Sequence, residues 1–113
     1  MNCLFCKIID KKIPASITFE NDNYLAFNDI DPKAPVHQLI IPKQHIATLN
    51  DISKSDMPII ADIFTIAQAL AQEQNIAESG YRLINNCNVD GGQTVFHIHF
   101  HLLGGKQLIH NLG

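Results

Sequence analysis

Apolar and polar residues alternate along the chain in patterns that predict two helices and five strands. Phe5, Ile8 and Ile9 recur at helical spacing, which predicts a short amphipathic helix over residues 4–11 that ends before Pro14. Runs rich in apolar and β-branched residues, bounded by turn-forming residues, predict strands over residues 16–20, 23–28, 36–42, 81–86 and 94–103.

Residues 54–75 carry the one long helical pattern. Its predicted buried face consists of Ile59, Ile60, Ile63, Phe64, Ala67, Leu70 and Ala71. Pro58 suits the first turn of a helix, so Ser55 is a better N-cap candidate than Ser53. Strands outnumber helices and neighbouring strands have short connections. This predicts an α+β fold, an antiparallel sheet with the long helix packed on one side.

Three histidines alternate with apolar residues near the end of the chain. Successive side chains of a strand point to opposite faces, so His97, His99 and His101 are predicted to share one face. A strand rises ~3.3 Å per residue, which separates His97 from His101 by roughly 13 Å. Because Zn–N bonds are only ~2.0–2.1 Å long, one metal ion could bind two of these imidazoles but not all three. The strand is therefore interpreted as a wall of an active site.

An imidazole can act as a nucleophile toward phosphorus as well as a base. His99 is the favoured nucleophile because it has a histidine two residues away on either side, and His101 could orient a phosphate oxygen or pass a proton to a leaving group. The alternative is that all three are metal ligands or structural histidines, but three at alternate positions favour function. His37, alone on its predicted strand, is left between a supporting and a structural role.

The loop before the triad contains Asp90-Gly91-Gly92-Gln93-Thr94. Two adjacent glycines let backbone N–H groups approach an anion closely, although Asp-Gly-Gly alone is most often a tight turn. Thr94 adds a hydroxyl and Asn86 an amide at the mouth of the same hairpin. Directly before a strand faced with histidines, the loop is interpreted as a phosphate-binding segment.

Cys3 and Cys6 form a single Cys-x-x-Cys motif. A structural zinc site needs four ligands, and His45 and His97 are the best candidates for the other two. The alternative is that the cysteines are two half-buried residues of the first helix. If His97 is a ligand, the triad divides into one structural and two chemical histidines.

Composition narrows the classes of partner. A net charge of −3 and a single arginine, Arg82, argue against a nucleic acid polymer but are compatible with a mononucleotide. The 113 residues fit one domain spanning 1–113. The N-terminus lacks a secretory pattern, and no apolar run approaches the ~20 residues that span a bilayer. We therefore expect a cytoplasmic protein without a membrane partner.

The stretch from Gly91 to Gly105, GGQTVFHIHFHLLGG, resembles the signature of the histidine triad (HIT) family, His-φ-His-φ-His-φ-φ, in its nucleotide-binding branch. Residues 3–9 (CLFCKII), 26–30 (AFNDI) and 41–46 (IPKQHI) extend the resemblance over nearly the whole chain. It implies a homodimer whose two five-stranded antiparallel sheets join into one. It also implies hydrolysis of the P–N bond of purine nucleoside phosphoramidates (AMP or GMP linked to an amine), and of aminoacyl-adenylates, with no cofactor in the chemistry.

The resemblance also implies roles for individual residues. His99 matches the nucleophile that becomes nucleotidylated, His101 a histidine that contacts phosphate, and Asp29 the acid that holds the ribose hydroxyls. Asn86 and Thr94 match polar groups around the phosphate, with threonine standing where serine is common. The remaining nucleotide-binding positions are Phe5, Ile8, Phe27, Asn28, Ile30, Gln93 and Val95, and the zinc ligands of metal-containing relatives match Cys3, Cys6, His45 and His97.

We therefore expect a purine nucleoside phosphoramidase that acts through a nucleotidyl intermediate on His99. One alternative is a dinucleotide polyphosphate hydrolase of the same family, but such enzymes usually carry a longer segment before the triad. The other is a non-catalytic nucleotide-binding or zinc-stabilised interaction module, against which the intact His99 and Asp29 argue.

Overall fold

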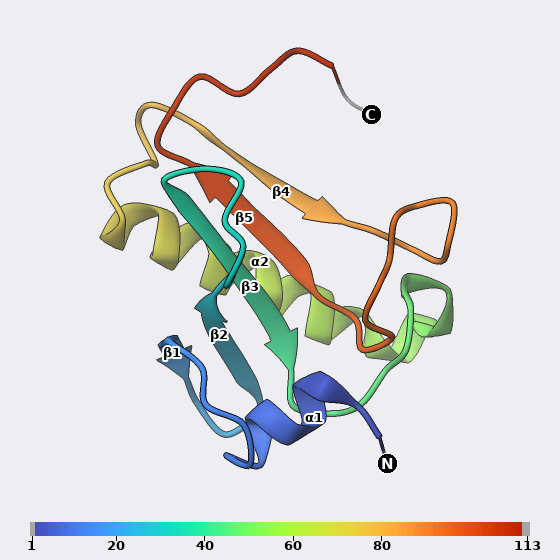
Figure 1. Ribbon diagram of the computed structural model, residues 1–113. Coiled ribbons are helices and arrows are strands. Elements are labelled where there is room, and N and C mark those ends of the chain that lie inside the picture. Colours follow the sequence, from blue (N-terminus) through green and yellow to red (C-terminus); the bar gives the residue numbers. More distant parts are fainter. Residues whose placement is uncertain (1, 112–113) are drawn as a thin grey trace.

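The computed structural model describes residues 2–111, which form an antiparallel five-stranded sheet with helices on both faces. The elements are α1 (Leu4–Ile9), β1 (Ile17–Glu20), β2 (Tyr24–Asn28), β3 (Val36–Pro42), the 3₁₀ turns η1 (Leu49–Asp51) and η2 (Lys54–Asp56), α2 (Met57–Glu73), β4 (Tyr81–Asn85) and β5 (Phe100–Gly104). The strand order is β1-β2-β3-β5-β4, as Figure 1 shows. The predicted α+β fold is confirmed.

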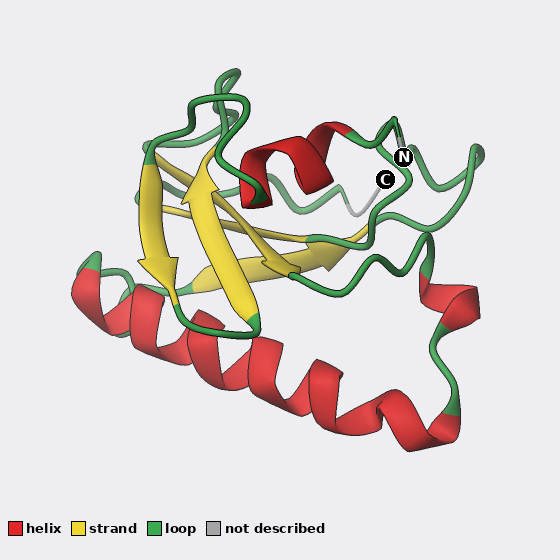
Figure 2. Cartoon of the chain, turned by 90° about the horizontal axis from the view of Figure 1, so that it is seen from below, coloured by secondary structure: helices red, strands yellow, loops and turns green. Residues whose placement is uncertain are grey.

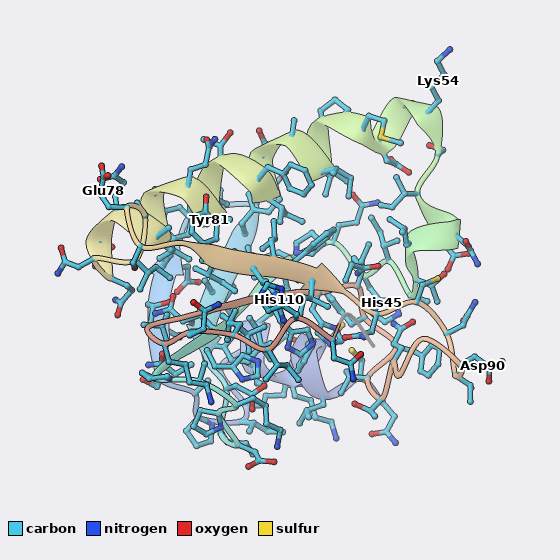
Figure 3. All side chains as sticks on the ribbon, turned by 90° about the horizontal axis from the view of Figure 1, so that it is seen from above. His45, Lys54, Glu78, Tyr81, Asp90 and His110 are labelled. Carbon is cyan, nitrogen blue, oxygen red and sulfur yellow. The ribbon has the colours of Figure 1, made fainter. Side chains whose placement is uncertain are left out.

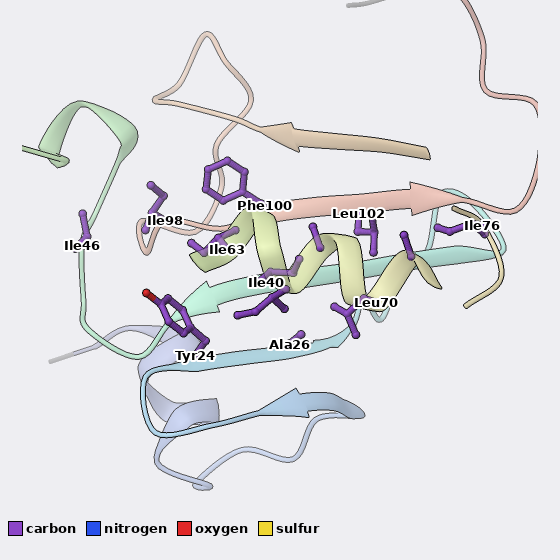
Figure 4. Packing of buried hydrophobic residues seen from close by; sticks show 13 residues of the cluster. Tyr24, Ala26, Ile40, Ile46, Ile63, Leu70, Ile76, Ile98, Phe100 and Leu102 are labelled. Carbon is purple, nitrogen blue, oxygen red and sulfur yellow. The ribbon is translucent and has the colours of Figure 1, made fainter. Parts of the chain in front are cut away.

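Helix α2 covers one face of the sheet, and α1 lies on the opposite face (Figure 2). The larger core cluster lies under α2, where Ile63 and Leu70 meet Ile40 of β3 and Leu102 of β5 (Figure 4). These four side chains are at most 1% exposed, and burying an aliphatic side chain contributes about 1.5–3 kcal/mol. A second cluster lies under α1 and contains Phe5, Ile8, Phe27, Leu39 and Ile41 together with Leu25 and Cys3.

The start of the long helix differs from the prediction. Residues 54–56 form a 3₁₀ turn, and α2 begins only at Met57. Ser53 forms a capping box with Asp56 at this turn, so the preference for Ser55 as the cap is wrong. Phe64 is 49% exposed, because the face that α2 buries against the sheet is narrower than the predicted apolar face. No helix within residues 2–111 is both long enough and apolar enough to span a bilayer.

The last strand is shorter than predicted. β5 begins at Phe100, so only His101 of the triad lies in a regular strand, and the chain bends at residues 95–97. β3 ends at Pro42, which has no N–H to offer. The N–H of Ile98 instead donates to the carbonyl of Ile46, at 2.7 Å. On the other side, the side chain of Asn85 donates to the carbonyl of His99, at 3.0 Å.

The predicted division between the two faces nevertheless holds. Ile98, Phe100 and Leu102 belong to the core cluster beneath α2. The rings of His97 and His99 contact Phe5 of α1, and the ring of His101 contacts that of His99. Loop contacts therefore maintain the alternation of side chains between the two faces in the residues that precede the regular strand β5.

Candidate active site and metal centre

A cavity of about 350 Å³ lies between α1, the end of β2 and the segment that leads into β5. Predicted nucleotide-binding and catalytic residues that line it are Phe5, Ile8, Phe27, Asn28, Asp29, Ile30, Thr94, Val95, His99 and His101. A predominantly apolar cavity with a few polar groups in its lining suits a ligand with an aromatic base and a charged phosphate.

The imidazole of His99 has its tautomer set by its own chain. Its Nδ1 lies 2.8 Å from the backbone carbonyl oxygen of His97. A carbonyl can only accept, so Nδ1 carries the proton and Nε2 keeps its lone pair. Burial lowers the pKa of His99, which maintains the neutral ring. A buried imidazole in this state can attack an electrophile without first losing a proton.

His101 is oriented by a second histidine, His37. The N–H of Lys33 donates to Nδ1 of His37 at 3.0 Å, so the proton of the neutral His37 ring lies on Nε2. That Nε2–H lies 2.9 Å from Nδ1 of His101, which therefore accepts, leaving the His101 proton on its own Nε2. Burial and the nearby His99 and His37 lower the pKa of His101 to about 4. Near pH 7 His101 is a neutral hydrogen-bond donor rather than an imidazolium.

Sheet register explains the pairing of these two histidines. His37 lies opposite Leu103, and Leu39 lies opposite His101, so His37 and His101 are diagonal neighbours on one face of the β3–β5 pair. Sequence reasoning left His37 undecided because no local pattern reveals which residues face each other across strands. Asn85, which holds the carbonyl of His99, was missed for the same reason.

The polar residues divide between the cavity and an adjoining hollow of about 330 Å³. Asp29 and His101 line both spaces, whereas Asn86 lines only the second, together with His37 and other residues. One carboxylate oxygen of Asp29 accepts from the N–H of Asp31, at 2.8 Å. The amide of Asn86 donates to the carbonyl of Gly91, at 2.7 Å. The two spaces thus meet at His101 and Asp29.

Gln93 lies away from the cavity. Its side chain donates to the carbonyls of Ala47 and Val95 and accepts from the N–H of Asn88, so it holds the loop together from within. These contacts give Gln93 a role in supporting the loop, and its predicted contact with the nucleotide stays a prediction. The N–H of Gly92 donates to the carbonyl of Val89, at 3.0 Å, which favours the tight-turn interpretation of the two glycines over an anion nest.

Cys3, Cys6, His45 and His97 form a compact cluster whose four ligand atoms all lie within 4.8 Å of one another. Nδ1 of His97 lies 3.6 Å from each sulfur and 3.2 Å from Nδ1 of His45. The other nitrogen of His97 faces the carbonyl of Pro42 at 2.8 Å and must donate to it. The Nδ1 lone pair therefore points at the cluster, and the bond to Pro42 orients the ring as metal-binding histidines require.

The cluster also has the chemistry of a cation site. Burial and the adjacent Cys3 raise the pKa of Cys6 to about 11. A bound cation would stabilise the thiolates, and a Cys₂His₂ donor set suits zinc. His45, labelled in Figure 3, follows β3.

A second group, Asp29, His37 and His101, is similarly compact but does not suit a metal ion. Nδ1 of His37 already accepts the Lys33 N–H, so the nitrogen that faces Asp29 and His101 carries a proton. A protonated nitrogen has no lone pair to donate. This group is a hydrogen-bonded relay, and the cysteine cluster is the candidate metal centre.

Comparisons with known proteins agree with this geometry. A family model described as "Scavenger mRNA decapping enzyme C-term binding" matches residues 2–111. The chain is 49% identical to the purine nucleoside phosphoramidase of Escherichia coli (strain K12) over 105 residues, 93% of this chain and 88% of that protein. It is also 49% identical over 107 residues to an uncharacterized HIT-like protein of Buchnera aphidicola, covering 95% of this chain and 94% of the relative.

Solved structures give the same result. A HIT family hydrolase from Legionella pneumophila has a TM-score of 0.97 and 54% identity, covering 99% of this chain and 100% of that one. A histidine triad protein from Clostridium difficile has a TM-score of 0.96 and 44% identity, covering 98% and 96%. The chain belongs to the histidine triad family. In this histidine triad protein, the triad segment and the first helix meet at one cavity.

Proposed function

We propose that this histidine triad protein is a hydrolase of purine nucleoside phosphoramidates that cleaves the P–N bond through a nucleotidyl intermediate on His99. The observation that carries the proposal is the unprotonated Nε2 of His99, fixed by the bond from Nδ1–H to the carbonyl of His97, in a ring that lines a base-sized cavity. The resemblance to the Escherichia coli phosphoramidase supports the same reaction.

The cavity accounts for the nucleotide part of the substrate. A purine ring would lie among Phe5, Ile8, Phe27 and Ile30, and the carboxylate of Asp29 would accept hydrogen bonds from the ribose hydroxyls. The phosphate would then lie beside His99 and His101, which also line the cavity. The adjoining hollow beside Asn86 would take the leaving amine, because it shares Asp29 and His101 with the cavity.

The chemistry is two displacements at phosphorus. Nε2 of His99 forms a bond to phosphorus while the P–N bond breaks, and the leaving amine takes up a proton that passes from solvent through the nearby polar groups. Water then attacks phosphorus, the P–His bond breaks, and AMP and neutral His99 are released with the surplus proton passing to solvent. The N–H groups of Thr94 and Val95 and the Nε2–H of His101 would stabilise the charge on the phosphate oxygens.

The low pKa of His101 favours one of its two proposed tasks. A ring with a pKa of about 4 carries one proton at neutral pH and holds it tightly in the free protein. It therefore suits hydrogen bonding to a phosphate oxygen better than protonation of the leaving amine. His37 supports this task by fixing which nitrogen of His101 carries the proton.

Rapid mixing with a fluorogenic AMP phosphoramidate, followed by intact-mass analysis and peptide mapping, tests the proposal. We expect a transient AMP adduct on His99. Turnover without that adduct would reject the covalent mechanism. Preferential cleavage of a dinucleotide polyphosphate would favour the alternative enzyme of the same family, and nucleotide binding without cleavage of either substrate would favour a non-catalytic module.

We also propose that Cys3, Cys6, His45 and His97 bind zinc, which would link α1 to the two segments that carry the histidines. Zinc in a closed site of four protein ligands stabilises structure and leaves no open position for substrate. We propose that the hydrolysis itself requires no cofactor. Elemental analysis of the purified protein, with one zinc per chain expected, tests this assignment.

A homodimer formed through β4 is the proposed assembly. β1 and β4 are the two edges of the sheet, and β1 is short with an irregular register between Ile17 and Phe19. β4, which begins at Tyr81 (Figure 3), pairs regularly with β5 and can accept another strand on its open side. Native mass spectrometry should give twice the chain mass of 12.6 kDa. The cytoplasm is the proposed compartment, because its reducing conditions keep both thiols reduced.

A further inference from the structure

We infer that the metal centre and the nucleotide cavity are thermodynamically coupled through Phe5, so that a metal ion bound to the Cys/His cluster and AMP in the cavity each raise the affinity for the other. The inference rests on the proposed nucleotide site and zinc site. It gives the metal centre a role in substrate binding beyond general stability.

Helix α1 is the element shared by the two sites. It has only six residues, from Leu4 to Ile9, and isolated helices of that length are unstable. Cys3 is its N-cap residue and Cys6 lies in its first turn, so both thiols of the metal centre belong to this helix. The two histidines of the centre come from other segments: His45 follows β3, and His97 precedes β5. A metal ion bound to this cluster would fix the position of α1 relative to the rest of the protein.

Phe5 lies between the two cysteines and is 4% exposed. Its ring meets that of His99 at a centroid distance of 5.0 Å with nearly perpendicular planes, and that of His97 at 6.0 Å. It also packs edge-on against Phe27, at 5.5 Å, and lines the nucleotide cavity. One side chain therefore contacts a metal-ligand ring, the proposed nucleophile and the wall of the base pocket.

A second connection runs through His97. Its ring lies in the metal cluster, and its carbonyl accepts the Nδ1–H of His99. A metal ion that holds the His97 ring thus also holds the carbonyl that orients His99. Both connections lead from the cluster to His99.

The coupling follows from the conformational ordering of helix α1. When α1 is held in place, a nucleotide binds a preformed wall and does not have to order the helix; when α1 is loose, binding must do so at a cost. Linkage makes the effect reciprocal, so AMP must strengthen metal binding by the same factor. Coupling between sites typically amounts to 5–150-fold, and we expect roughly tenfold here.

Transfer of zinc from the intact, zinc-loaded protein to a chromophoric chelator measures the coupling without any turnover. At saturating AMP, the apparent zinc affinity should rise roughly tenfold. AMP itself binds zinc weakly and would accelerate loss of the metal, so its own chemistry acts in the opposite direction. Calorimetry on the zinc-loaded and chelator-treated protein should show the same factor in the affinity for AMP.

Phe5→Leu keeps an apolar side chain but removes the ring contacts to His97 and His99. In this variant the effect of AMP on zinc affinity should fall to less than threefold. The matched control is Ile30→Ala, which alters another wall of the cavity from a fully exposed loop position that is not part of the metal cluster. It should weaken AMP binding yet leave the coupling factor unchanged.

Zinc affinity that is the same with and without saturating AMP would overturn the inference, as would full coupling in Phe5→Leu. Neither result would contradict the proposed reaction, which is tested separately by turnover and by the AMP adduct on His99. Conversely, intact coupling in a protein that binds AMP but hydrolyses no phosphoramidate would reject the proposed reaction and leave the inference standing.

Discussion

The Nδ1 atom of His99 lies 2.8 Å from the backbone carbonyl oxygen of His97, two residues earlier in the chain. This local bond selects the tautomer in which Nε2 keeps its lone pair. The ring of His97 meanwhile faces the cysteine cluster with its own Nδ1. Two histidines of one motif therefore present opposite nitrogens to their partners, which separates a metal ligand from a candidate nucleophile.

Replacement of His99 should abolish turnover while nucleotide binding persists. His99→Asn retains a polar side chain of moderate size but has no imidazole nitrogen to attack phosphorus. We expect turnover of an AMP phosphoramidate to fall by roughly 10⁴-fold or more. Calorimetry should give an AMP affinity within a few fold of the wild type. Substantial residual turnover would reject His99 as the nucleophile.

Removal of His37 should impair turnover through His101. His37→Asn loses the Nε2–H that bonds to Nδ1 of His101, so the His101 ring can adopt the wrong tautomer. The loss of about 1 kcal/mol predicts a roughly fivefold to tenfold fall in kcat with little change in KM. His110→Asn, in the exposed C-terminal segment, is the matched control and should leave both constants unchanged.

The metal centre can be tested with two equivalent cysteine substitutions. Cys6→Ser removes one ligand of the cluster, whereas Cys87→Ser changes a cysteine outside it. We expect Cys6→Ser to lose bound zinc and to unfold roughly 10 °C below the wild type in calorimetry. Cys87→Ser should retain one zinc per chain. Equal zinc content in the two variants would contradict the ligand assignment.

Acid should destabilise the fold through its buried histidines. Burial lowers the pKa values of His37, His99 and His101. The unfolded chain, with pKa values near ~6.5, therefore binds more protons than the folded protein below that pH. The free energy of unfolding should be fully present above pH ~6.5 and decline toward pH 4, where His101 titrates.

Urea titrations of the wild type and His101→Asn between pH 7.5 and 4 check this prediction. The variant lacks one of these three histidines and should lose less stability over that range. Equal slopes in the two proteins would show that His101 titrates alike in the folded and unfolded states.

Leu102 provides a test of the packing beneath α2. Its side chain is fully buried against the helix, and Leu102→Ala should cost about 2–5 kcal/mol in the free energy of unfolding. Ile30 is fully exposed, so Ile30→Ala should change that free energy by less than about 0.5 kcal/mol. Similar losses in both variants would mean that this cluster does not dominate stability.

The local pattern of apolar and polar residues was sufficient to predict most of the fold. The spacing of apolar residues identified both helices and all five strands, and β3 spans the predicted residues 36–42. The alternation of His97, His99 and His101 with apolar residues also placed the histidines on the face opposite α2. These features depend on the period of a helix or strand, which neighbouring residues determine.

Contacts between distant segments had to come from the tertiary structure. The pairing of His37 with His101 depends on the register of β3 against β5, and the bend before Phe100 depends on Pro42 and Ile46. The scaffolding contacts of Gln93 depend on Ala47, which lies 46 residues away. A sequence specifies which side chains share a face, because that follows from backbone geometry within one element. Which nitrogen of each imidazole is free depends on polar groups that only folding brings within hydrogen-bond distance.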